Sequence, residues 1–116
     1  MQTFKELFVW QKSISLVKEV YLATGHMPKD ERFGLVSQMK RSSVSIPSNI
    51  AEGYKRRTRG EYIHFLGIAD ASAAELETQI IISSELYNEV DFDRSTALLC
   101  EVQRMLFVMI RKLVNQ

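Results

Sequence analysis

The sequence contains few of the turn-forming residues that β-rich folds need and few of the cysteines that disulfide-linked folds need. Its 116 residues include one cysteine, two prolines and five glycines. A single cysteine rules out an internal disulfide and fits a reducing compartment. So few turn-forming residues disfavour an all-β fold, which needs many short connections. With 46% apolar and 25% charged residues, the composition is typical of one globular domain spanning residues 1–116.

Long apolar runs are also missing. The longest, MLFVMI at residues 105–110, is far too short to cross a bilayer. The first twelve residues, MQTFKELFVWQK, carry charges where a secretory signal would need an apolar core. We therefore expect a cytoplasmic protein that does not associate with a membrane.

Positive charge is absent from one long segment. Residues 61–93 contain eight acids and no Lys or Arg, so their net charge is −8. The flanking segments are basic, with +6 over residues 1–60 and +3 over residues 94–116. The acidic segment is expected either to face a basic surface or to form a negative face of its own.

Apolar residues recur at helical spacing in four segments, at about residues 5–24, 29–57, 58–87 and 93–113. In the first segment the stripe predicted to be buried is Leu7, Trp10, Ile14, Val17 and Tyr21. In the second it is Val36, Met39, Ser43, Ile46 and Ile50. Thr58 and Glu61 have the spacing of a capping box, and Asp93 is the candidate N-cap of the fourth helix. Short connections predict an all-α fold, an antiparallel up-and-down four-helix bundle.

Two of these helices are apolar on more than one face. Residues 105–110 cover the whole circumference of the fourth helix, and QIIIS at residues 79–83 has a similar effect on the third. A helix that is apolar all round must be buried all round, but a four-helix bundle leaves each helix an outer face. We therefore expect a second subunit to cover it. The predicted oligomer-interface residues are Ile81, Ile82, Met105, Phe107, Val108 and Ile110.

A polar motif, RSSVSIPSNIAEG at residues 41–53, interrupts the second helix. Pro47 lacks an N–H, so the helix should bend, or break and restart, at this residue. The neighbouring serines can satisfy backbone groups that the proline leaves free. Asn49 and Glu52 lie on one helical face, followed by Gly53. They are either internal caps or a recognition surface.

Positive charge is concentrated around this motif. Six cations lie within twenty residues: Lys40, Arg41, Lys55, Arg56, Arg57 and Arg59. They predict a surface that neutralises nucleic-acid phosphates, and Tyr54 and Tyr62 beside them could stack on unpaired bases. The alternative is a solvated helix end whose cations suit the C-terminal dipole.

Residues that could carry catalysis are few. Glu61 and His64 form an E-x-x-H pair, but a di-iron site needs a second such pair and further glutamates. Cys100 has no histidine near it in the sequence and is expected to be buried and structural. The sequence has no glycine-rich phosphate loop and no metal-spaced Cys/His cluster. We expect no enzyme activity, no metal and no cofactor.

Three stretches of the chain resemble one known family. They are FKELFVWQKSISLVKEVY at residues 4–21, FGLVSQMKRSSVSIPSNIAEGYKR at 33–56 and EYIHFLGIADASAAELETQI at 61–80. All three look like the four-helix-bundle family encoded by intervening sequences in bacterial 23S rRNA genes. The residues that match the family's motif are Arg41, Ser45, Pro47, Asn49, Glu52 and Gly53.

That family is similar to the accessory variability determinant of diversity-generating retroelements, which forms pentameric barrels and binds nucleic acid and a reverse transcriptase. The resemblance implies a homo-oligomeric ring, a pentamer, without enzyme activity. We therefore predict a non-enzymatic accessory protein that binds RNA or DNA through its basic patch, with Asn49 and Glu52 shaping the adjacent surface. The alternative is a protein-interaction scaffold that presents its charged faces to a partner protein and does not bind nucleic acid.

Overall fold

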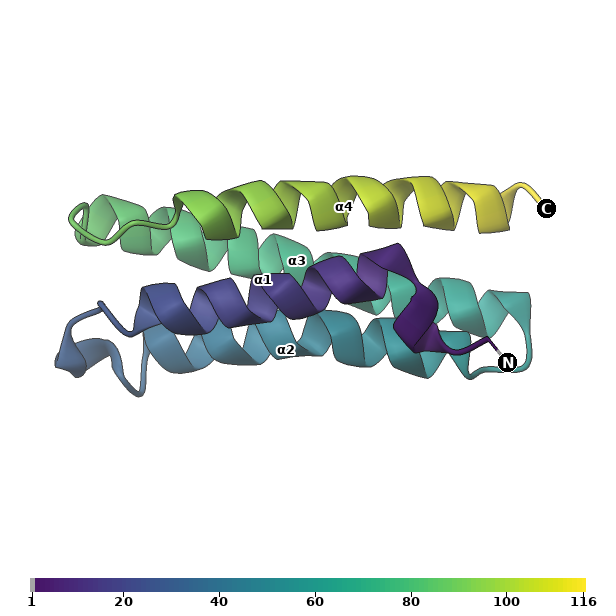
Figure 1. The fold of residues 1–116 in the computed structure, drawn as a ribbon, viewed down its shortest axis with the longest axis horizontal. Coiled ribbons are helices and arrows are strands. Elements are labelled where there is room, and N and C mark those ends of the chain that lie inside the picture. The colour runs from purple at the N-terminus through teal and green to yellow at the C-terminus, as the bar shows by residue number, and fades with distance from the viewer. Residues whose placement is uncertain (1) are drawn as a thin grey trace.

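Four α-helices run antiparallel along a bundle of 45 × 24 × 20 Å (Figure 1). The computed structural model describes residues 2–116, and within that range the chain is all-helical. The helices are α1 (Phe8–Thr24), α2 (Leu35–Tyr54), α3 (Arg59–Leu86) and α4 (Asp93–Val114). Two short 3-10 turns, η1 (Phe4–Glu6) and η2 (Lys29–Glu31), precede α1 and α2. Each helix packs against the next, and α4 returns to α1, with the most extensive contact between α2 and α3. This confirms the predicted up-and-down bundle.

The core is a continuous layer of aliphatic side chains from all four helices. Its largest fully buried members are Leu16, Met39, Ile46, Ile50, Leu66, Leu76 and Leu106. The whole predicted stripe of α2, from Val36 to Ile50, lies in this core or at its edge. At about 25 cal/mol per Å² of apolar area, burial of these side chains is the main stabilising contribution to the fold.

The predicted stripe of α1 is wrong in part: Leu7 and Trp10 are half-buried and pack against the core, but Ile14, Val17 and Tyr21 do not form the core face. The chain is extended at Leu7, so α1 starts at Phe8, and its buried side chains are Val9, Ser13, Leu16, Val20, Ala23 and Thr24. Trp10, Ile14 and Val17 are only half-buried, and Tyr21 is 45% exposed. The reason is that α1 is apolar on two adjacent faces, and its core face contains a serine. The Ser13 hydroxyl donates to the Trp10 carbonyl at 2.7 Å, which allows it to be buried.

Helix α2 continues through Pro47 as one helix. The alternative in which the helix breaks and restarts is therefore wrong, whereas the bend at this residue stays a prediction. Ser43 lies one turn before the proline, and its hydroxyl donates to the Lys40 carbonyl at 2.9 Å. Pro47 itself is buried, so its ring contributes apolar area that offsets part of the cost of the missing hydrogen bond.

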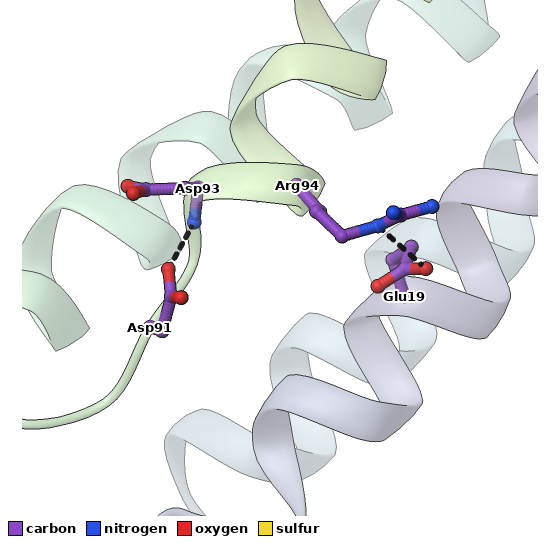
Figure 2. A network of polar contacts seen from close by, with 4 residues as sticks. All are labelled: Glu19, Asp91, Asp93 and Arg94. Carbon is purple, nitrogen blue, oxygen red and sulfur yellow. Dashed lines mark hydrogen bonds and ion pairs between the residues drawn. The ribbon is translucent and has the colours of Figure 1, made fainter.

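Helix α3 begins with the predicted cap. The Glu61 N–H donates to Thr58 Oγ1 at 3.2 Å, and the Thr58 hydroxyl donates to the Glu61 carboxylate at 3.0 Å. The cap of α4 differs from the prediction, because Asp93 is the first residue of the helix and the N-cap position is Phe92, whose side chain makes no capping bond. Asp91 Oδ1 accepts the Asp93 N–H at 2.8 Å (Figure 2).

At the same end of the bundle, an ion pair joins α4 to α1. The Arg94 guanidinium donates to Glu19 Oε1 at 3.0 Å (Figure 2). This end also holds the turn between α1 and α2 and the turn between α3 and α4 (Figure 1). Acids dominate the α3–α4 turn, with Glu85, Glu89, Asp91 and Asp93 all exposed.

Candidate nucleic-acid interface

The opposite end of the bundle brings together cations from distant parts of the sequence. The connection from α2 to α3 lies there, together with both chain ends (Figure 1). Arg59 Nη1 donates to the carbonyl oxygen of Gln116 at 2.7 Å, which fixes the last turn of α4 beside the start of α3. Arg111 and Lys112 lie in that last turn. We call this surface the cationic end; its members are Lys55, Arg56, Arg57, Arg59, Arg111 and Lys112.

Two of the six predicted cations do not belong to the cationic end. Arg41 precedes Lys55 by fourteen residues, which is about 21 Å along a helix. Lys40 lies beside α1, with its Nζ atom 4.7 Å from the centroid of the Tyr21 ring. The sequence therefore overestimated the patch on α2 and missed Arg111 and Lys112. The signal that could have found them is topology, because in an up-and-down bundle the second and fourth helices end at the same end of the bundle.

The members of the cationic end differ in how free they are to bind a ligand. Arg56 Nη2 lies 3.1 Å from Glu52 Oε2, and its guanidinium lies 4.5 Å from the centre of the Phe65 ring. Because both partners of this pair are exposed, the pair contributes little stability. Within residues 2–116, Lys55 and Arg57 form no ion pair, and both are exposed. Their charges are available to phosphate.

Tyr54 and Tyr62 pack against each other beside the cationic end. Their rings meet edge to face with centroids 6.2 Å apart, and both are half-buried. Burial raises the pKa of Tyr62 to about 12, with a smaller contribution from Tyr54. This contact and the partial burial leave each ring only part of its surface for stacking on a base.

The serine-rich motif forms the contact between α2 and α3. Ser45 and Ser72 place their Oγ atoms 2.8 Å apart across the two helices. Asn49 Nδ2 donates to the Ser45 carbonyl at 2.8 Å and to its hydroxyl at 3.0 Å. Gly53 is buried and Glu52 is exposed. Within the protomer, Asn49 therefore makes its hydrogen bonds inside α2, Gly53 is buried between the helices, and Glu52 alone of the three is exposed.

The six predicted interface residues divide into two groups. Ile81, Ile82, Phe107 and Val108 are between 42% and 62% exposed. Met105 and Ile110 are half-buried and pack against the core. Four of the six predicted interface residues thus remain in contact with solvent in one protomer.

The candidate chemical groups are scattered. Cys100 is exposed, so the prediction of a buried cysteine is wrong. It follows Leu99 of the core by one residue, a rotation that takes it off the buried face. His64 is exposed on α3, with its ring edge-on to Phe65 at 5.5 Å. Residues 2–116 contain no group of three His, Cys, Asp or Glu side chains that could hold a metal ion.

No described helix combines the length and apolar character needed to span a bilayer. The fold and the site together define an all-α four-helix-bundle protein with one cationic end. Residues 5–108 match the family described as 23S rRNA-intervening sequence protein, and the chain belongs to this family. The resemblance identified from the sequence is thus confirmed.

A solved structure shares the fold. It is a crystal structure, at 1.70 Å resolution, of a protein of unknown function from the S23 ribosomal protein family of Bacteroides thetaiotaomicron VPI-5482. The match has a TM-score of 0.75 and 24% sequence identity, and it covers 88% of this chain and 97% of the Bacteroides chain. No curated protein matches the sequence.

Proposed function

We propose that this protein is a non-enzymatic accessory protein that binds RNA or DNA as a homo-oligomer, a pentameric ring, with the cationic end as the binding surface. One observation carries the proposal: the fold gathers cations from residues 55–59 and 111–112 at one end of the bundle, tied together by the contact between Arg59 and Gln116. The opposite end carries the acids of the α3–α4 turn. This separation of charge would orient a polyanion toward one end.

Phosphate recognition suits these side chains better than base readout. Lys55 and Arg57 are long, exposed and free of ion pairs within the described residues. Such side chains neutralise phosphates and release counterions, so the affinity should fall steeply with salt and depend little on base sequence. The nearby aromatic pair is half-buried, which supports contact with the backbone rather than with splayed bases.

Oligomerisation would raise the affinity of the cationic end for nucleic acid. Copies related by a rotation axis along the bundle would place all their cationic ends on one rim. Several patches on one nucleic acid raise avidity by roughly 10² or more without any new contact. The exposed apolar side chains Ile81, Ile82, Phe107 and Val108 support such self-association. Because the family description refers to 23S rRNA, a fragment of that RNA is the first ligand to test.

Two charge-matched double variants test the binding surface. Arg57→Glu with Arg111→Glu reverses two charges at the cationic end, and Lys29→Glu with Arg32→Glu reverses two exposed charges at the other end. Retention of a labelled RNA fragment and of a DNA of equal length is measured at several salt concentrations. We expect the first variant to lose binding and the second to keep most of it.

Equal losses in both variants would indicate a net-charge effect and overturn the proposed surface. A slope of log affinity against log salt near zero would exclude phosphate binding. If neither RNA nor DNA is retained and the oligomer is intact, the protein is instead a scaffold for a partner protein.

A further inference from the structure

An apolar groove lies on the outside of the bundle between α1 and α2. It has a volume of about 300 Å³, and the side chains that line it include Trp10, Ile14, Val17, Val44, Pro47 and Ala51. Three of these residues belong to the stripe that the sequence pattern of α1 assigned to the core. In one protomer Val44 is 41% exposed. Single exposed apolar residues are ordinary, but here they line a hollow that a closely packed partner could fill.

The groove has a basic rim. Lys40 lies over the Tyr21 ring at the edge of α1. Arg41 is one helical turn before Val44, and Lys18 is one turn after Ile14, so both flank the groove. Arg41 and Lys18 are exposed. Glu52, one turn after Ser48 of the lining, is also exposed, so the rim is positive at its Lys40 and Arg41 end. It suits an occupant that is small at its centre and acidic toward that end.

The outer face of α3 has this character. Gly67, Ala71 and Ala74 follow one another at helical spacing, and all three are exposed. A Cβ atom at Gly67 would meet nothing within 4 Å, so the space outside this face is open in the protomer. Glu75 and Glu77 are exposed on either side of this face, and no Lys or Arg occurs between residues 61 and 93.

The two surfaces lie at the same level of the bundle. The contact between Ser45 and Ser72 fixes the register of α2 against α3. Lys40 and Arg41 come four or five residues before Ser45. Glu75 and Glu77 come three to five residues after Ser72. Because the helices are antiparallel, both displacements run toward the same end, by about 5 to 8 Å. If two copies lie side by side and parallel, the cations of one copy and the acids of the other lie at the same position along the bundle axis.

We propose that α3 of a second copy docks in the α1–α2 groove, with Glu75 and Glu77 of one copy facing Lys40 and Arg41 of the other. This inference rests on the homo-oligomer of the proposed function and names one pair of surfaces within it. The groove and the α3 face lie on different sides of one protomer, so the contact is heterologous and closes into a ring if the rotation permits. The parallel arrangement keeps every cationic end on the same rim.

A charge swap tests the pairing on nuclease-treated protein, which separates it from nucleic-acid binding. Lys40→Glu with Arg41→Glu, and separately Glu75→Lys with Glu77→Lys, should each raise the concentration for half-assembly about tenfold or more. All four changes in one chain leave the net charge unchanged and should restore assembly. Light scattering coupled to size exclusion gives the mass, and circular dichroism verifies that each variant folds.

A steric probe tests the α3 face without changing charge. Gly67→Trp fits the isolated protomer because the position is open, and it should give a folded monomer. Gly60→Trp is the matched control: this second exposed glycine also has no neighbour within 4 Å, but it lies beyond the level of the groove. It should leave assembly intact.

Three results would overturn the inference. They are a monomeric wild type at micromolar concentration, a fourfold swap that assembles no better than either double variant, or normal assembly of Gly67→Trp. In the last two cases the copies use another surface, and nucleic-acid binding at the cationic end is still open to its own salt titration.

Discussion

Gly53 of α2 lies so close to Phe65 of α3 that a Cβ atom at position 53 would be 2.9 Å from the Phe65 Cβ atom. The same atom would be 3.0 Å from Cδ1 of Tyr62 and 3.2 Å from its carbonyl oxygen. None of these neighbours is the free end of a flexible side chain. Gly53 therefore sets the distance between the two helices just where the connection to the cationic end begins.

Gly53→Ala should destabilise the fold. Overpacking against a backbone and two ring-bearing side chains costs about 1–3 kcal/mol, while alanine gains roughly 1 kcal/mol over glycine in a helix, so we expect a net loss of up to about 2 kcal/mol. Gly60→Ala is the control, since a Cβ atom there meets nothing within 4 Å. Urea unfolding of both variants at one protein concentration measures the difference. A Gly53→Ala protein as stable as the wild type would show that α2 and α3 can separate without cost.

Asn49 is expected to be a structural residue rather than a recognition residue. Asn49→Ala removes two hydrogen bonds to Ser45 and should lower the free energy of unfolding by about 1–2 kcal/mol. Glu52→Ala, at an exposed site three residues away, should change it by under about 0.5 kcal/mol. Unfolding and RNA retention are measured on both proteins. Loss of RNA binding in a fully stable Asn49→Ala protein would contradict this assignment.

The sequence pattern was sufficient for the fold and for the core face of α2. There the apolar residues lie on one face only, from Val36 to Ile50, and burial follows directly from the 3.6-residue period. In α1 the same period describes two adjacent faces. Choosing between them requires knowledge of where α2 and α4 lie, which is a tertiary property. The face that contains Ile14 and Val17 fits the same pattern but lines the outer groove.

The candidate site was only partly predictable for a related reason. Lys55, Arg57 and Arg59 are neighbours in sequence and in space, so a local count of charges finds them. Arg111 and Lys112 join them through the contact between Arg59 and Gln116, which spans 57 residues. The motif around Asn49 allows two interpretations from sequence alone, because internal hydrogen bonds and surface recognition use the same polar residues.

The hydrogen bond between Glu31 and Tyr87 connects η2 to the end of α3, and its contribution to stability should be lost in acid. The Tyr87 hydroxyl donates to Glu31 Oε2 at 2.6 Å, and the Leu35 N–H donates to Oε1 at 3.3 Å. These bonds, the first more than the second, hold the pKa of Glu31 below its ordinary value of 4.5. A depressed pKa means that the folded state binds fewer protons than the unfolded state. The resulting stability is complete above about pH 4.5 and is lost as the pH falls through the folded pKa.

Tyr87→Phe should move the pKa of Glu31 back toward its ordinary value. Carbon-detected NMR of the Glu31 carboxyl during an acid titration measures this directly, and the acid limb of thermal stability should become shallower in parallel. Glu89→Gln, at an exposed carboxylate nearby, controls for a general change in charge. An unchanged Glu31 titration in the Tyr87→Phe protein would show that the hydrogen bond does not persist in solution.

Single cations of the cationic end should contribute unequally to nucleic-acid binding. Each phosphate contact that is lost reduces the slope of log affinity against log salt by about one. Arg57→Ala should show this full reduction, since Arg57 is exposed and forms no ion pair within residues 2–116. Arg56→Ala should show less, because Glu52 already neutralises that guanidinium.

The pairing of Arg56 with Glu52 also predicts a gain. Glu52→Ala frees the Arg56 guanidinium and removes one negative charge beside the phosphates, so both the affinity and the salt slope should rise toward those of a surface with one more cation. In Arg56→Ala, the same change at Glu52 should leave the slope where it was, because there is no guanidinium to release. Titrations of the two single variants and the double variant form a complete cycle. If Glu52→Ala raised the slope equally in both backgrounds, the effect would come from net charge alone, and Arg56 would not be a phosphate ligand.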